Sequence, residues 1–283
     1  LPLGNPAGRG DLSVLLFGLG IAVRRGFTVQ DGADFVQALA DLVLVSAVVG
    51  MIVLAAAQLL GQILLLHPVI RIHMRMVSIA SGSSGNCIYV GSEATHLLVD
   101  VGISGKKAEA GLNSLGLTGR DLDGILVTHE HMDHVAGLGV MARKYEVPIY
   151  ATTGTLEEIQ KMGNLGKIDP ALFREVKEDV KLTIKDLTVN PMKISHDAAQ
   201  PVGYRIAYGD KKVGICTDLG VYNDYTVECL KGMDALLLEA NHDVKMLQVG
   251  PYPYYLKQRI LGDRGHLSNE NSGKLLCRIL HDK

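Results

Sequence analysis

The feature that most restricts the fold of this chain is a dense group of metal-ligating side chains behind a short apolar segment. The sequence THEHMDH at 128–134 places three of the ten histidines and two carboxylates between His129 and His134. Imidazole and carboxylate are the ligands that zinc, manganese and iron(II) use, so this density favours a metal site over a core. Residues 125–128 are typical of a buried strand, and α/β folds place ligands at the C-terminal ends of such strands.

The order of residues within this group predicts more than one ion. In an extended segment, His129, His131 and Asp133 would point the same way, because strand side chains alternate. His134 breaks that alternation, which fits a second ion beside the first. The residues from Val135 to Tyr145 are then expected to form a helix.

Potential ligands also follow three other predicted strands. Asp100, His196 and Asp218 each lie directly behind a segment with the apolar pattern of a strand. Residues far apart in sequence but all at strand ends can converge on one rim of a layered sheet. A single site built from several strands is therefore expected.

Two metal ions need about six or seven protein ligands between them. The set expected here is His129, His131 and His196 for one ion, Asp133, His134 and one more histidine for the other, and Asp218 as the bridge. A water that bridges two divalent ions has its pKa lowered from about 15.7 toward neutrality, which supplies a hydroxide nucleophile at ordinary pH. Asp133 is counted among the catalytic residues as well. Asp100 is suited to hold the outer nitrogen of a ligand histidine, and a carboxylate in a turn is the alternative interpretation.

Composition and cysteine spacing indicate a compartment but no global partner. The net charge is −2 and the isoelectric point is near 6.6, so overall charge does not favour a polyanion, although a local basic surface stays open. The four cysteines are widely spaced without a C-x-x-C pair, which predicts reduced thiols in a cytoplasmic protein. Tryptophan is absent and aromatic residues are sparse, which argues against base-stacking platforms.

The N-terminal residues 1–73 differ in character from the rest of the chain. Residues 42–66 form a run of 25 residues without a charge, which is long enough to cross a bilayer as a helix. Three interpretations stay open: a membrane anchor, upstream sequence joined by a misplaced start, and a buried helical hairpin. Met74 or Met76 would be a natural start in the second case. The predicted domains are therefore a hydrophobic extension at 1–73 and a hydrolase domain at 76–283.

Seven sequence blocks, in order, carry a resemblance to a known family. They are SGSSGN at 81–86, THEHMDH at 128–134, SHDA at 195–198, TDLG at 217–220, LEANHD at 238–243, GPYPYYLKQRI at 250–260 and GHLSNE at 265–270. Together they resemble the YycJ/WalJ branch of the metallo-β-lactamase superfamily, over residues 76–283. The resemblance implies an α/β (α+β) fold with an αββα sandwich and two divalent ions, Zn²⁺ or Mn²⁺. It also implies a phosphodiesterase that acts on DNA ends as a 5′-end-directed exonuclease.

The resemblance also assigns roles outside the ligand set. Glu239 and His266 resemble a pair that assists protonation of the leaving group in related tRNA-maturing phosphodiesterases. The SGSSGN loop, with Ser84 and Asn86, is expected to present backbone N–H groups to a phosphate, and a tight turn is the alternative. His242 is a further candidate on the substrate side.

One departure from the family affects the second ion. The family carries a further histidine in a second HLS-type block, on a strand after the last helix, and this sequence ends at Lys283 before that point. The second ion would then lack a ligand and the sandwich its closing strand, which predicts weak activity. His281 follows a predicted helix rather than a strand and is not assigned as a ligand.

Two other functions stay open on the sequence alone. The same fold serves hydrolases of cyclic phosphodiesters, thioesters or lactams. A membrane-tethered module that uses an incomplete site for binding is the second alternative, and it requires residues 42–66 to insert into a bilayer. The sequence does not indicate an oligomeric state.

Overall fold

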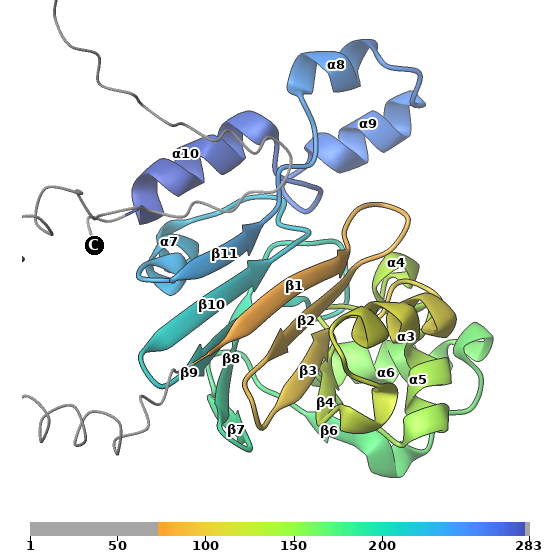
Figure 1. The fold of residues 1–283 in the computed structure, drawn as a ribbon. Coiled ribbons are helices and arrows are strands. Elements are labelled where there is room, and N and C mark those ends of the chain that lie inside the picture. The colour runs from red at the N-terminus through yellow and green to blue at the C-terminus, as the bar shows by residue number, and fades with distance from the viewer. Residues whose placement is uncertain (1–72, 281–283) are drawn as a thin grey trace, which may run out of the picture. The chain divides into compact units, whose positions relative to one another are not determined.

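The computed structural model describes residues 73–280, which form two β-sheets packed face to face with helices on both outer faces (Figure 1). The first sheet has six strands in chain order: β1 (Arg75–Ala80), β2 (Cys87–Gly91), β3 (His96–Val99), β4 (Gly124–Leu126), β5 (Ile149–Ala151) and β6 (Phe173–Glu175). The second sheet has the order β11-β10-β9-β8-β7, from β7 (Leu182–Ile184), β8 (Leu187–Lys193), β9 (Val202–Tyr208), β10 (Lys211–Cys216) and β11 (Ala235–Leu238).

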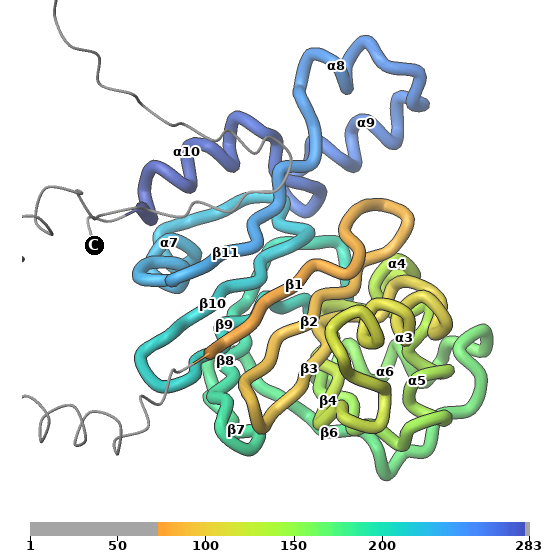
Figure 2. Tube along the Cα trace, in the orientation of Figure 1, coloured from red at the N-terminus to blue at the C-terminus, as the bar shows by residue number. Residues whose placement is uncertain are grey.

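The helices divide between the two outer faces. The first sheet is covered by α3 (Gly105–Ser114), α4 (Met132–Val135), α5 (Leu138–Tyr145) and α6 (Thr153–Lys161), with short 3₁₀ turns at Gly119–Asp121, Gly163–Leu165 and Pro170–Leu172. The second sheet is covered by α7 (Asp224–Leu230) and α10 (Asn269–Ile279). Between β11 and α10 the chain makes an excursion through α8 (Val244–Val249) and α9 (Tyr254–Leu261), which Figure 2 shows away from both sheets.

Apolar side chains fill the three spaces between these four layers. In the first sheet, Leu98 and Ile125 face the helices, whereas their neighbours Leu97 and Leu126 face the second sheet. A sheet that is buried on both faces needs near-continuous apolar runs, because alternate residues of a strand point to opposite faces. A third cluster, which includes Leu275, lies between the second sheet and its helices. The predicted αββα order is therefore confirmed.

The helix expected from Val135 to Tyr145 is wrong in its boundaries. The structure has two helices, α4 and α5, separated at Gly137. The N–H of Gly137 donates to the Val101 carbonyl at 2.8 Å, and a Cβ at this position would lie 2.2 Å from the Ile103 carbonyl oxygen. This close approach of two backbones breaks the helix. The terminal helix does begin as expected, with Ser268 as the N-cap accepting from the Asn271 N–H.

Polar contacts join the two sheets at the end opposite to the C-terminal ends of β3 and β8. The carboxylate of Asp186, in the β7–β8 turn, accepts hydrogen bonds from the hydroxyls of Ser92 and Thr95 in the β2–β3 turn. Beside it, the ammonium of Lys185 lies 2.6 Å from a carboxylate oxygen of Asp123. These five residues form what we call the turn latch.

Part of the sequence-based prediction falls outside the described residues. Residues 1–72, with the uncharged run at 42–66, and residues 281–283, with His281, belong to that part. Within residues 73–280, no helix combines the length and apolar character needed to span a membrane.

Candidate metal centre

Three histidines from two sheets point ring nitrogens at one another. Nε2 of His129 lies 3.1 Å from Nδ1 of His131, which lies 3.2 Å from Nε2 of His196. A tetrahedral ion with Zn–N bonds of about 2.0–2.1 Å separates its ligand nitrogens by about 3.3 Å. The three nitrogens therefore stand at separations that suit a common divalent ion.

The outer nitrogens of two of these rings are held by the protein. Nδ1 of His196 donates to the carbonyl of Gly265 at 3.1 Å, which leaves Nε2 as the free acceptor. Nδ1 of His129 lies 3.0 Å from the hydroxyl of Thr128. Outer contacts of this kind fix the tautomer and orientation of metal-binding histidines.

A second group of donors forms around His134, which is fully buried. Nε2 of His134 lies 2.8 Å from a carboxylate oxygen of Asp218, and His129 belongs to the same group. On the other side of the ring, Nδ1 lies 2.8 Å from Asp100, which also accepts from the N–H and the hydroxyl of Thr128. The structure thus places Asp100 against the outer nitrogen of His134, and its role toward a metal stays a prediction.

Both aspartates reach the rim through an unusual backbone conformation. Asp100 directly follows β3, and Asp218 is the second residue after β10, with φ of 61° and 52°. Left-handed backbone is uncommon outside glycine, and aspartate is one of the residues that tolerates it. At such positions strain often accompanies function. In this conformation Asp100 contacts Thr128 and His134, and Asp218 contacts His134 and His266.

Asp133 lies at the margin of the site. The segment is not extended there, because α4 begins at Met132, so the alternation expected for His129, His131 and Asp133 ends at the helix. The side chain of Asp133 is 35% exposed, and one oxygen lies 3.7 Å from Nε2 of His134. Asp133 belongs to none of the three donor groups whose atoms lie within 4.8 Å of one another in the described residues.

The third donor group joins the residues expected to handle the leaving group. Nδ1 of His266 lies 2.7 Å from Glu239 and 3.2 Å from Asp218. Burial opposes the charge of the imidazole, but the two carboxylates raise the pKa of His266 to about 10. Burial raises the pKa of Glu239, whose second oxygen accepts from the N–H of Leu219 at 2.8 Å.

The remaining predicted residues lie around this centre with different contacts. Nδ2 of Asn86 lies 3.0 Å from Nε2 of His134, while Ser84 is exposed in the adjoining turn. The N–H groups of Gly82, Gly85 and Asn86 are already bonded within the protein, as the turn interpretation requires. The ring of His242 contacts Asn241 and lies outside the three donor groups. Their roles toward a substrate stay predictions.

Sequence reasoning missed several residues that position the candidate ligands. Glu130 is buried and accepts from the N–H of Ala199 at 2.7 Å, which holds the loop that carries His196. Arg264 donates to the carbonyl of His196 at 3.0 Å. Arg259 forms an ion pair with Asp197, at 2.5 Å and 3.1 Å. These partners lie 62 to 69 residues apart, so no local pattern marks them.

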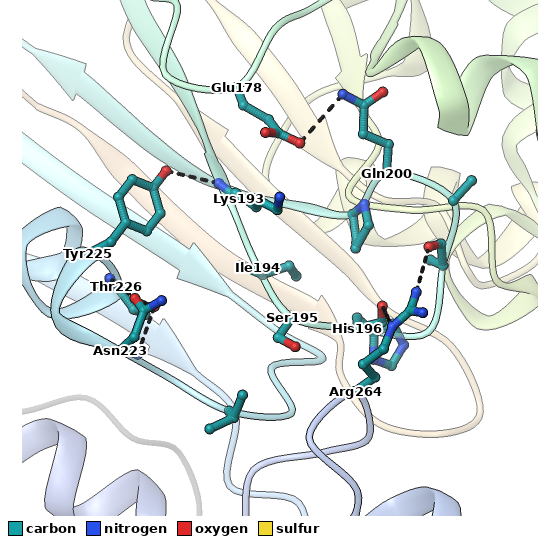
Figure 3. Close-up of a pocket in the computed structure, with 14 residues that line it drawn as sticks. Glu178, Lys193, Ile194, Ser195, His196, Gln200, Asn223, Tyr225, Thr226 and Arg264 are labelled. Atoms are coloured by element: carbon teal, nitrogen blue, oxygen red, sulfur yellow. Dashed lines mark hydrogen bonds between the residues drawn. The ribbon is translucent and has the colours of Figure 1, made fainter.

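A cavity of ≈ 480 Å³ adjoins the same loop (Figure 3). Its wall includes the basic side chains of Lys193 and Arg264 and the carboxylate of Glu178, which lies 3.4 Å from Gln200. The hydroxyl of Tyr225 accepts from the Lys193 N–H at 3.1 Å. Apolar side chains, Ile194 and Val221 among them, complete the wall, so the lining is mixed.

Comparison with known proteins places the chain in a family. The model of the beta-lactamase superfamily domain matches residues 95–280. The exodeoxyribonuclease YycJ of Bacillus anthracis is 42% identical over 206 residues, which cover 72% of this chain and 77% of the relative. The chain belongs to the YycJ/WalJ family of this superfamily. The exodeoxyribonuclease WalJ of Streptococcus pneumoniae agrees, with 41% identity over 72% of this chain and 76% of the relative.

Solved structures agree with the fold. The metallo-β-lactamase fold protein YhfI from Bacillus subtilis has a TM-score of 0.54 at 21% identity, covering 73% of this chain and 81% of that one. Zn²⁺-bound PqqB from Methylobacterium extorquens has a TM-score of 0.52 at 19% identity, covering 65% of this chain and 68% of that one. The predicted family and fold class are confirmed, and membership together with the donor groups supports use of a divalent metal.

Proposed function

We propose that this chain is a metal-dependent exodeoxyribonuclease that hydrolyses phosphodiester bonds at DNA ends. The observation that carries the proposal is the convergence of three histidine nitrogens beside the facing pair of His134 and Asp218. The YycJ/WalJ relatives are named exodeoxyribonucleases, which gives this donor set a substrate class.

We assign two divalent ions, zinc or manganese, to these donors. The set is His129, His131 and His196 for the first ion, Asp133 and His134 for the second, and Asp218 between them. Bound divalent ions lower the pKa of a coordinated water and offset charge on phosphoryl oxygens. The protein contributes the orientation of three of the four rings, those of His129, His196 and His134, through Thr128, Gly265 and Asp100.

His266 is placed to handle the proton of the leaving oxygen. Its Nδ1 faces two carboxylates, those of Glu239 and Asp218, so a proton is held on that nitrogen. The ring can then offer the proton on Nε2 to the leaving oxygen as the bond breaks. Glu239 is fixed in turn by the N–H groups of Leu219 and Leu267, which keeps the pair oriented.

Metal removal and reloading test the proposal. The full chain is stripped with a chelator, reloaded with zinc or manganese, and incubated with DNA labelled at its 5′ or its 3′ end. We expect nucleotides to be released only by the metal-loaded protein. His131→Ala and Asp133→Ala should each abolish this release while leaving the circular dichroism spectrum close to that of the wild type, because both side chains are partly exposed.

Lys161→Ala is a matched control, because Lys161 is exposed on α6 and, among residues 73–280, forms an ion pair with Glu158 alone. Full activity of His131→Ala in a metal-loaded sample would contradict the two-ion assignment. Turnover of nitrocefin without any digestion of DNA would replace the proposed substrate with a lactam.

A further inference from the structure

The excursion between β11 and α10 is long, but few of its residues are buried in the core. Helix α8 buries only Leu247 and α9 buries none of its residues. Folded segments usually bury an apolar face. A folded segment that leaves its apolar residues exposed is a candidate for a binding surface. Figure 1 shows the two helices standing away from both sheets.

Exposed tyrosines are concentrated on this excursion. All ten tyrosines of the chain lie in the described residues, and only three are exposed: Tyr252 at 54%, Tyr254 at 77% and Tyr255 at 75%. Met246 and Val249 of α8 are exposed beside them in sequence. The low aromatic content argued against a stacking platform, but the structure gathers its exposed aromatic rings within four consecutive residues.

The base of the excursion is built into the candidate active site. The chain leaves just after Glu239 and returns at His266, and these two side chains meet at 2.7 Å. The N–H of Asn241 donates to the Leu267 carbonyl at 2.9 Å, and the His266 N–H donates to the Ile260 carbonyl at 3.0 Å. The end of α9 is therefore tied directly to the proposed general acid.

A charged contact turns one face of α9 toward the same site. Arg259 is paired with Asp197, whose other contacts are His131 and His196. Tyr255 lies four residues before Arg259, so the two share a face of the helix and stand about 6 Å apart along its axis. This face leads from His131 and His196, through Asp197 and Arg259, outward to Tyr255.

The charge of the excursion is opposite to that of the whole chain. Residues 243–264 contain four basic residues (Lys245, Lys257, Arg259 and Arg264) and two acidic ones (Asp243 and Asp263), a net of +2 against −2 for the chain. Aromatic faces interleaved with basic residues bind single strands, because every base can stack and the phosphates meet positive charge.

We propose that the tyrosines at 252, 254 and 255 form a stacking platform for unpaired nucleotides of a DNA substrate, beside the bond that is cleaved. This rests on the proposed function as a nuclease. The platform holds bases of a single strand, so it selects ends that are unpaired or that have been opened. It acts in binding and takes no part in the chemical step.

Binding to strands with and without bases tests the platform. Fluorescence anisotropy is measured with the metal-loaded full chain and a phosphorothioate oligothymidylate, which resists hydrolysis, and with an abasic strand of the same length. Tyr254→Ala/Tyr255→Ala should weaken binding of the thymidine strand by about fivefold per stacked base, about 25-fold together, and leave the abasic strand nearly unaffected. Tyr254→Phe/Tyr255→Phe keeps both rings and should bind like the wild type.

Two further readouts separate the platform from the proposed function. Hydrolysis of methyl p-nitrophenyl phosphate, a phosphodiester without a base, should be unchanged in both tyrosine variants. If the wild type digests DNA and the alanine pair binds the thymidine strand as tightly as the wild type, the platform is overturned while the nuclease assignment stands. If the alanine pair instead converts a dimer to a monomer in light scattering without changing DNA affinity, the tyrosines form a contact between two copies. If the wild type releases no nucleotide from DNA, the nuclease assignment fails, and the binding data still decide the platform.

Discussion

Replacing Asp100 with asparagine tests how the centre fixes the proton of His134. The carboxylate of Asp100 is fully buried, accepts two hydrogen bonds from Thr128 and faces Nδ1 of His134, all at 2.8 Å. A carboxylate only accepts, so Asp100 keeps a proton on Nδ1, and a metal bound beside Asp218 would take the place of a proton on Nε2. Asparagine has the same shape and tolerates the φ of 61°, so the backbone should not change.

The expected losses of metal affinity and stability follow from the hydrogen bonds in which the amide of Asp100→Asn becomes a donor instead of an acceptor. In Asp100→Asn the oxygen can stay on the Thr128 N–H, and the NH₂ group then faces Nδ1 of His134. The imidazole must accept there, so its proton moves to Nε2, where it blocks a metal. Changing an outer partner of this kind costs about 10- to 100-fold in metal affinity. The Thr128 hydroxyl also loses Asp100 as an acceptor, and one lost hydrogen bond costs about 0.5–1.5 kcal/mol of unfolding free energy.

Two measurements separate these effects. Competition with a fluorescent zinc chelator gives the affinity of each ion, and urea unfolding of the metal-free protein gives the stability. Asp210→Asn, at an exposed carboxylate in the β9–β10 turn, is the control and should change neither. Unchanged affinity for both ions in Asp100→Asn would refute the argument that Asp100 sets the tautomer.

Three further predictions concern stability and backbone space. Burial opposes the ionised form of Asp186, but hydrogen bonds from Thr95 and Ser92 lower its pKa below 3.8. A lowered pKa stabilises the fold above the unfolded-state pKa, and this effect is lost as pH falls through the folded-state pKa. Asp186→Asn should therefore unfold at lower urea than the wild type near pH 7, and the difference should shrink as the pH is lowered into the acidic range. Gly102→Ala would put a Cβ 1.6 Å from the Asp133 carbonyl oxygen and should abolish DNA digestion, whereas Gly163→Ala meets nothing within 4 Å and should digest DNA normally. Gly273 lies inside α10 with open space around it, so Gly273→Ala should raise the unfolding free energy by about 0.5–1 kcal/mol, and a lower melting temperature would contradict this.

The fold and the main donors could be predicted because their signals are local. The apolar run ending at Thr128 marks a strand, and the spacing of His129, His131 and His134 marks candidate ligands wherever that strand lies. His196 and Asp218 follow strands in the same way. The YycJ/WalJ resemblance then supplied the layer order, which the described residues confirm.

The shape of the ligand segment could not be predicted, because contacts distant in sequence impose it. The carbonyls of Asp133 and His134 accept from the N–H groups of Asn86 and Val101 at 2.7 Å and 2.8 Å. These bonds curl the segment into α4 and turn Asp133 outward. The positioning role of Glu130 could not be predicted for the same reason, because its partner, the Ala199 N–H, belongs to the loop that follows β8 in the second sheet.

The division of donors between the two sheets makes the candidate centre a cross-link of the sandwich. His129, His131 and His134 follow β4 of the first sheet, whereas His196 and Asp218 follow strands of the second. Divalent ions held by both sets would therefore tie the sheets together at one end, as the turn latch does at the other. Because such a site exists only in the folded chain, binding adds about 4 kcal/mol of unfolding free energy when free metal stands at about 1,000 times its dissociation constant. The free metal concentration would then affect the folded fraction of the protein as well as its activity, and a cell short of the metal would keep less of this protein folded.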